Sequence, residues 1–393
     1  MKLYLNDLGL LCAAGSSQVE VLKRLLAGDR SGLIETDEFS SGHNVILGQI
    51  TGQLPEIDPK SSYYQCRNNQ LLLAALSQIS KTVDDMMVQF GGDRIGIVLG
   101  TSTSGVRNTE LALAWQAKKG GLPDGFHYKQ QQMGAGADFL ATYLGINGPA
   151  YTVSTACSSS GKAFASARRL INLGICDAVI VGGADSLCSL TVNGFAALES
   201  LSSGFCKPFG LHRDGITIGE AVSLFILSKE PGPVALKGIG ATSDAYHFSA
   251  PDPAGTTVIS AMQRALDDAG ITPNDIDYLN LHGTATVLND AMESKAVNAV
   301  FGADLAVSSS KGMTGHTLGA AAALELAFCW LLLNRDDEQG ALIPNVNDDE
   351  RDSELASLNL VKKGMVLGRK INVCQSNSFA FGGNNLSIVI SRA

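Results

Sequence analysis

Charged side chains are scarce in this chain, and paired cysteines and long apolar runs are missing. Asp, Glu, Lys and Arg make up 17% of the 393 residues, with a formal net charge of −9, which favours neither nucleic acid nor an anionic membrane as a partner. The eight cysteines form no CxxC and no Cys/His pairing, so we expect reduced thiols, a cytoplasmic protein and no metal site. The most apolar stretch, 320–333, is interrupted by Glu325, and no membrane span is expected.

Hydrophobic residues and glycine are abundant instead, at 45% of the chain and 43 glycines. This composition is typical of an α/β protein, either one double-sized domain or two intimate halves. Strand-like and helix-like segments alternate, which predicts a layered α/β fold. Strands are expected at 3–5, 94–100, 149–154, 178–182, 222–227, 234–240, 276–281, 371–374 and 386–390, and helices at 19–26, 162–173, 256–269, 291–301 and 317–333.

Three of these segments carry finer predictions. The strands 178–182 and 222–227 are continuous apolar runs of the kind that parallel sheets bury on both faces. The helix 19–26 has a capping serine at Ser16 or Ser17. A Pro-Gly turn at 230–233 separates two strands and is the weakly marked boundary that we expect between the two halves of the chain.

Cys157 lies where an apolar strand turns into a small-residue helix, in the run Thr-Ala-Cys-Ser-Ser-Ser-Gly. Unpaired backbone N–H groups and the positive end of a helix dipole at such a turn favour thiolate over thiol, and the thiolate is the nucleophile. The alternative is a buried structural cysteine, because most intracellular cysteines pack in cores. Cys157 is therefore a candidate nucleophile. Residues elsewhere in the chain decide between this interpretation and a structural cysteine.

Two of the six histidines lie in turns rich in Gly, Ser and Thr. His282 ends an apolar strand, and His316 follows Lys311-Gly-Met-Thr-Gly just before an alanine-rich helix. A third glycine-rich turn, 377–385, contains Phe381. Each histidine alone is more often a satisfied core or turn residue, but a nucleophilic cysteine with such histidines is a reasonable catalytic constellation.

Taken together, these segments resemble the elongating β-ketoacyl-[acyl-carrier-protein] synthases, which are decarboxylating condensing enzymes of the thiolase-like superfamily. The resemblance runs over essentially the whole chain. It is carried by five ordered motifs: the Cys157 turn; Lys207-Pro-Phe with His212-Arg-Asp-Gly and Gly219-Glu220; His282-Gly-Thr-x-Thr; Lys311-x-x-x-Gly-His316 with Glu325 nine residues on; and Phe379-x-Phe381-Gly-Gly-Asn384.

The resemblance implies a role for each catalytic residue. Cys157 takes an acyl group from the phosphopantetheine thiol of a carrier protein. His282 and His316 stabilise the enolate that forms when malonyl-carrier loses CO2. Lys311 orients the histidines and pairs with Glu325, whose charge on an otherwise apolar helix needs a partner.

Further residues are assigned to substrate handling by the same resemblance. The backbone N–H groups of Cys157 and Phe381 are expected to form the oxyanion hole, and Phe381 also resembles the gate that moves when the acyl chain enters. Thr284 and Thr286 resemble the threonines that bind the pantetheine arm. No metal and no cofactor is implied, because the partner's phosphopantetheine arm carries the substrates.

The resemblance also implies an architecture and partners. The fold is expected to be a five-layered αβαβα arrangement of two duplicated halves, 1–230 with the nucleophile and dimer interface, and 231–393 with the histidine pair and gate. An acyl carrier protein is the expected partner, and a homodimer the expected assembly, with a heterodimer with a related subunit left open. Because carriers are acidic, a basic docking patch is expected. Its candidates are Arg67, Lys118, Lys119, Lys129 and Lys207.

One alternative function is a non-catalytic subunit resembling a chain length factor, which has the fold without the cysteine. Cys157 favours the enzyme. Three segments depart from housekeeping members: 284–290 lacks the usual proline, three serines at 158–160 follow the cysteine, and 120–136 is atypical where the family builds its dimer interface and the end of its acyl pocket. These departures indicate a specialised synthase for polyene- or polyketide-like chains.

Overall fold

Two half-sheets with the same strand order form the centre of the protein, whose computed structural model describes residues 2–393. The order is β5-β4-β6-β8-β1 in the first half and β11-β10-β13-β14-β9 in the second. In both, the first three strands are parallel and the last two antiparallel to their neighbours. The strands are β1 (Leu3–Cys12), β4 (Ile95–Gly100), β5 (Ala150–Val153), β6 (Ala178–Asp185), β8 (Ala221–Ser228), β9 (Val234–Ser243), β10 (Tyr278–Asn280), β11 (Ala306–Ser308), β13 (Val373–Ala380) and β14 (Asn384–Arg392).

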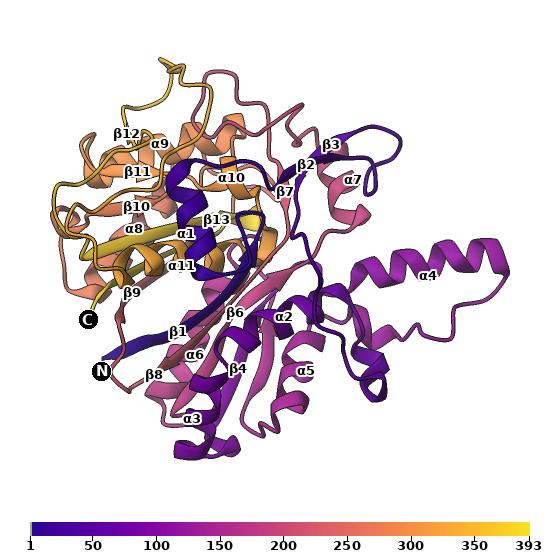
Figure 1. Ribbon diagram of the computed structural model, residues 1–393. Helices are drawn as coiled ribbons and strands as arrows, with labels where there is room; N and C mark the ends of the chain where they lie inside the picture. Colours follow the sequence, from indigo (N-terminus) through magenta and orange to yellow (C-terminus); the bar gives the residue numbers. More distant parts are fainter. Residues whose placement is uncertain (1) are drawn as a thin grey trace.

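The two half-sheets meet at β1, which bonds to β8 on one side and β9 on the other. They therefore join into one 11-stranded sheet, with β12 (Asn359–Leu360) at its far edge. In Figure 1 the first half runs from indigo to magenta and the second from orange to yellow, with the two termini close together. A separate small sheet contains β2 (Leu33–Thr36), β3 (Val45–Gly48) and β7 (Ile218–Gly219).

Helices form the three remaining layers. Between the half-sheets, α6 (Ser159–Asn172) packs against β4 and β6, and α11 (Ala321–Asn334) packs against β13, β14 and β8. Because it is covered on all sides, α11 is apolar around its whole circumference except at Glu325. The outer layers are α2 (Arg67–Gln78), α3 (Ser80–Phe90) and α5 (Ala135–Leu144) on the first half, and α8 (Thr256–Ala269) and α9 (Val287–Phe301) on the second. The five-layered αβαβα fold of two duplicated halves is thus confirmed.

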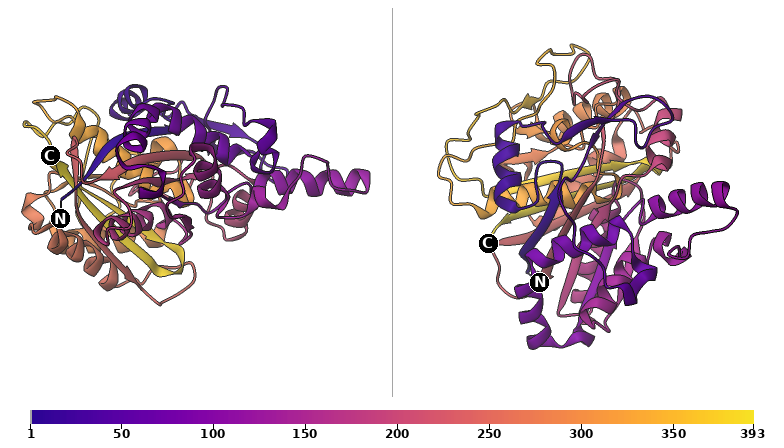
Figure 2. Two further views of the ribbon diagram at one scale, coloured as in Figure 1. Left: turned by 90° about the horizontal axis from the view of Figure 1, so that it is seen from below. Right: turned by 45° about the vertical axis from the view of Figure 1, so that its right-hand side comes forward.

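Shorter elements complete the chain. Among residues 2–393, no helix combines the length and the apolarity that crossing a membrane requires. One helix, α4, projects away from the body in both Figure 1 and Figure 2. The remaining elements are α1 (Gln18–Ala27), α4 (Val106–Lys119), α7 (Ser189–Ala197), α10 (Lys311–Thr314) and the 3₁₀ turns η1 (Pro59–Tyr64), η2 (Gly92–Arg94), η3 (Tyr128–Gln131), η4 (Pro273–Asp275), η5 (Leu318–Ala320) and η6 (Phe381–Gly383).

Each predicted strand and helix is present, with shifted ends, and one orientation was predicted wrongly. Ser17 is the cap of α1, since its side chain accepts a hydrogen bond from the Glu20 N–H. The run 222–227 was expected in a parallel setting, but β8 is antiparallel to both β1 and β6. Its apolar run reflects burial by helices on both faces, which an antiparallel strand inside five layers also has.

Candidate active site

Cys157 lies in a strained turn between β5 and α6. The preceding residue, Ala156, has a φ of +51°, a left-handed conformation that alanine rarely adopts. Ser159 Oγ stabilises this turn, because it accepts from the Thr155 N–H at 2.8 Å and donates to the Ala156 carbonyl at 2.5 Å. Ser160 Oγ accepts from the backbone N–H of α11 at 3.0 Å. The serines after the cysteine therefore hold the nucleophile's backbone in place.

The structure brings the cysteine and both histidines together from the two halves of the chain. His316 Nε2 lies 3.0 Å from Cys157 Sγ. The His282 and His316 rings are 5.4 Å apart, centre to centre, at an angle of 86°. One ligand-type atom from each residue lies within 4.8 Å of the others, and all three residues are buried. Thiol and imidazole are thus close enough for proton transfer.

Lys311 lies directly behind His282. Its ammonium forms an ion pair with Glu325 Oε1, donates to the His282 carbonyl, and lies 3.5 Å from His282 Nδ1. Both side chains of the ion pair are almost completely buried. A cation facing Nδ1 favours the tautomer with the proton on Nε2, so His282 is held as a hydrogen-bond donor. The same charge disfavours a metal ion among the three ligand atoms.

Burial has the largest effect on the pKa values of the three side chains in the site. It raises the pKa of the Cys157 thiol to about 11, although the Lys311 charge and the backbone N–H groups of Phe381 and Cys157 act in the opposite direction. Burial and the Lys311 charge hold the pKa of His282 and of His316 well below the usual value. The backbone N–H groups of the turn lower the pKa of Cys157 as expected, but desolvation by burial is the larger effect and the net shift is upward. The resting thiol and both imidazoles are neutral.

Two carboxylates that sequence reasoning missed hold the backbone of the His282 segment. Glu293 accepts from the N–H groups of His282 and Gly283, each at 2.7 Å. Asp290, one turn earlier on α9, accepts from the Ala285 N–H at 3.3 Å. Burial raises the pKa of Glu293 to about 7 and that of Asp290 to about 6. Their spacing of three residues on one helix after a His-Gly-Thr turn is the signal that could have found them.

A pocket of about 370 Å³ opens onto the three residues and contains the other predicted side chains. Thr284 and Thr286 line it, with their hydroxyls 2.8 Å apart. Phe381 also lines it, with its ring 5.6 Å from that of Phe195. Two glycines follow Phe381 with φ of +76° and +72°, left-handed conformations that glycine adopts without strain. The backbone N–H groups of Phe381 and Cys157 lower the pKa of the Cys157 thiol, so both act on the nucleophile.

The basic residues considered for carrier docking do not line this pocket. Arg67 pairs with Glu220, and the Lys129 ammonium lies over the Tyr64 ring. The two lysines at 118 and 119 lie in the last turn of α4. The charged residues that do line the pocket are Glu199, Asp214 and Asp244.

Comparison with known proteins agrees with this geometry. The model of the β-ketoacyl synthase N-terminal domain matches residues 56–231, and that of the C-terminal domain matches residues 234–347. Nodulation protein E of Rhizobium meliloti is 31% identical, over 98% of this chain and 97% of that protein. The 3-oxoacyl-[acyl-carrier-protein] synthase 2 of Staphylococcus aureus strain MRSA252 is 29% identical, over 100% of this chain and 98% of that protein.

Solved structures give the same result. One chain of the ketosynthase ApeO in complex with its chain length factor ApeC, from Xenorhabdus doucetiae, is 43% identical with a TM-score of 0.95, over 100% of this chain and 98% of that chain. A β-ketoacyl synthase from Burkholderia phymatum is 26% identical with a TM-score of 0.87, over 100% of this chain and 99% of that chain. The chain belongs to the β-ketoacyl synthase family, in the enzyme class of the 3-oxoacyl-[acyl-carrier-protein] synthases.

Proposed function

We propose that this chain joins a Cys157-bound acyl group to malonyl-[acyl-carrier-protein], giving 3-oxoacyl-[acyl-carrier-protein] and CO2. The observation that carries the proposal is the buried set of Cys157 and two neutral imidazoles, with His316 Nε2 at 3.0 Å from the thiol. The only prosthetic group it requires is the phosphopantetheine of the carrier.

Acyl transfer begins at the Cys157–His316 contact. His316 Nε2 takes the thiol proton while Sγ attacks the thioester carbonyl of the acyl-carrier. The negative oxygen of the tetrahedral intermediate is stabilised by the N–H groups of Cys157 and Phe381. The intermediate then expels the pantetheine thiolate, which regains the proton from His316. Because the resting thiol has a pKa of about 11, this proton transfer is needed for acylation at neutral pH.

Decarboxylation follows when malonyl-carrier enters the pocket. Loss of CO2 leaves an enolate whose oxygen needs donors, and His282, held with its proton on Nε2 by Lys311, supplies one. Once Cys157 is acylated, His316 Nε2 no longer has to accept the thiol proton, and the neutral imidazole in its other tautomer, with the proton on Nε2, supplies the second. Donors fixed in advance are typically worth about 3–4 kcal/mol each on such a barrier. The carbanion then attacks the Cys157 thioester and releases the thiolate.

The test is a condensation assay with acyl-carrier and malonyl-carrier. Cys157→Ala should abolish 3-oxoacyl product but leave slow CO2 release, because the histidine pair remains. His282→Ala should abolish both. If Cys157→Ala still formed product, or if the native chain, with its partner subunit if one is required, released no CO2, the proposal would be wrong. The second result would favour the alternative, a non-catalytic subunit resembling a chain length factor.

We infer further that the chain works beside a second subunit of the same fold, which contacts α4. This helix projects from the body and exposes Leu111, Leu113 and Trp115, each with about half of its surface in solvent. A projecting helix with such a row is typical of an interface. The structure at 43% identity is a complex of the ketosynthase ApeO with its chain length factor ApeC, which favours a heterodimer over the expected homodimer. Native mass spectrometry distinguishes a heterodimer from a homodimer, and Trp115→Asp should weaken either assembly.

Several finer expectations belong to this proposal. The similarity to nodulation protein E and to a chain of the ApeO–ApeC complex supports a specialised synthase over a housekeeping one. The eight unpaired cysteines support a cytoplasmic location. We also propose that the two halves divide at 230–233, where the chain passes from β8 to β9.

An acidic carrier remains the proposed substrate donor. Mutating Lys118 and Lys119 to Glu should raise the KM for the carrier alone, and an equal effect on a small pantetheine mimic would contradict docking there.

A further inference from the structure

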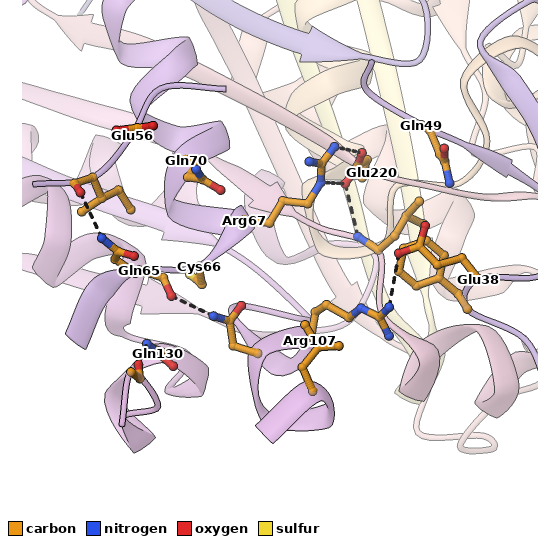
Figure 3. A pocket seen from close by; sticks show the side chains of 16 residues that line it. Glu38, Gln49, Glu56, Gln65, Cys66, Arg67, Gln70, Arg107, Gln130 and Glu220 are labelled. Carbon is orange, nitrogen blue, oxygen red and sulfur yellow. Dashed lines mark hydrogen bonds and ion pairs between the residues drawn. The ribbon is translucent and has the colours of Figure 1, made fainter. Parts of the chain in front are cut away.

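Asp185 is a buried carboxylate that takes no part in the proposed chemistry. It is the last residue of β6, and 1% of its surface is exposed. Two residues further on, Leu187 lines a cavity of about 900 Å³ at the base of α4 (Figure 3). Asp185 lines neither that cavity nor the pocket at Cys157, so its carboxylate is not placed to bind a ligand in either space.

Both oxygens of Asp185 accept hydrogen bonds, and the two oxygens face different segments of the chain. Oδ1 accepts from the backbone N–H groups of Ser102 and Thr103, each at 2.8 Å, in the loop that follows β4. The hydroxyls of Thr101 and Thr103 donate to the same oxygen, at 2.5 and 2.9 Å. Oδ2 accepts from the Gly319 N–H at 2.6 Å. The carboxylate therefore joins the loop after β4 to the turn η5 in the second half of the chain.

Each of these two segments is connected to a catalytic residue. The N–H group that donates to Oδ2 comes three residues after His316. In the loop after β4, the Thr101 carbonyl accepts from the Ser154 hydroxyl at 2.9 Å, and Ser154 comes three residues before Cys157. Short chains of hydrogen bonds through Asp185 thus connect the backbone of the nucleophile with the backbone of the base that takes its proton.

The position of the His316 ring depends on the backbone of its own turn. Its Nδ1 forms no hydrogen bond with any group in residues 2–393, whereas Nδ1 of His282 faces the Lys311 ammonium. Leu318, two residues after His316, has a φ of +50°, a left-handed conformation that is strained for leucine. Backbone of this kind persists only where its surroundings hold it. The hydrogen bond from the next N–H group to Asp185 Oδ2 is such a constraint.

The contact between Asp185 and Gly319 leaves little room for movement. A Cβ atom at Gly319 would lie 2.7 Å from the Ser102 nitrogen and 2.8 Å from Asp185 Oδ2, closer than real Cβ contacts come. Because such close packing is nearly incompressible, the position of the carboxylate determines the position of the turn. On the other side of His316, its own N–H donates to the Thr217 carbonyl at 2.6 Å. The backbone of His316 is therefore held from both sides.

We propose, resting on the proposed function, that Asp185 is a positioning residue for acyl transfer. By holding the turn after His316 against the loop that reaches Ser154, it keeps His316 Nε2 at 3.0 Å from Cys157 Sγ, within reach for proton transfer. An error of about 1 Å in such a geometry can cost about 100-fold in rate. Asp185 takes no proton itself and acts only through the position of His316.

The test is a double-mutant cycle of Asp185→Asn and His316→Ala in the full chain, with its partner subunit if one is required. An asparagine presents an NH2 group to one of the two segments, so the contact on that side is lost. The rate measured is acylation of Cys157 by a small acyl-pantetheine thioester, followed for hours by intact mass so that slow variants also give a rate. Asp185→Asn should lower this rate roughly 10- to 100-fold when His316 is present, and by less than about twofold in the His316→Ala background.

A carboxylate with a merely structural role would lower the rate equally in both backgrounds, and that result would overturn the proposal. Asp277→Asn is the matched control. Asp277 is also buried and accepts from the N–H groups of Asn372 and Val373, at 2.6 and 3.0 Å, but it is bonded to neither catalytic turn. This control should lose stability and keep the native acylation rate. An equal loss of rate in Asp277→Asn would also overturn the proposal.

Gly319→Ala tests the same contact from the other side, and it decides the question if Asp185→Asn does not fold. It should slow acylation as Asp185→Asn does, whereas Gly134→Ala, where a Cβ atom meets nothing within 4 Å, should not. A native rate in Gly319→Ala would overturn the role of Asp185 alone. If the native protein itself formed no acyl-enzyme, the proposed function would be at fault as well.

Discussion

The Lys311–Glu325 ion pair gives a prediction that separates stability from catalysis. Both groups are almost completely buried, and Lys311 also donates to His282. Glu325→Leu leaves an uncompensated ammonium in the core, which should lower the free energy of unfolding by about 3–5 kcal/mol. The double variant with Lys311→Met removes both charges among apolar neighbours and should recover most of that loss.

Catalysis should not recover with stability. Without Lys311, nothing holds the His282 proton on Nε2, so one enolate donor is lost, and condensation should fall roughly 100-fold or more in the double variant. Urea denaturation gives the stability and single-turnover condensation gives the rate. A double variant as unstable as Glu325→Leu would refute the claim that an unpaired ammonium causes the loss of stability. A double variant with native activity would refute the role of Lys311 in catalysis.

Three further predictions follow from individual contacts. Because the pKa of Cys157 is about 11, its alkylation by iodoacetamide should speed up about tenfold per pH unit from pH 7 to 10, and a plateau near neutral pH would contradict this. Glu293→Gln leaves one of two backbone N–H groups facing an amide NH2, so kcat should fall by about tenfold while KM for the carrier stays constant; a change confined to KM would count against it. Ser159→Ala removes the acceptor for the Thr155 N–H and should cost about 1–3 kcal/mol of stability by urea denaturation, so an unchanged midpoint would argue that the serine does not hold the turn.

The residues of the site could be predicted from the sequence because the signals are local. Cys157, His282 and His316 each lie at a strand or helix end among small residues, and that pattern survives without any tertiary information. Glu325 was also predictable, since one acid in an apolar helix needs a buried partner. The structure brings all of these together with Lys311, as the resemblance implied.

What could not be predicted depends on packing between distant segments. The pKa of Cys157 is set mainly by burial in the folded protein, and this desolvation exceeds the effect of the backbone N–H groups at the local turn. The orientation of β8 was missed because an apolar run reports burial and not direction. The roles of Asp290 and Glu293 depend on which backbone groups α9 faces. The cavity of about 900 Å³ that Arg67 and Arg107 line is formed by segments between residues 38 and 220, which no local pattern connects.

The most direct test of the central claim is intact-protein mass spectrometry after mixing the chain with a panel of acyl-carrier proteins. The account predicts a mass increase of one acyl group that is absent in Cys157→Ala. If no carrier acylated the folded chain, with or without its partner subunit, Cys157 would not be the nucleophile of a condensing enzyme and the account would be contradicted.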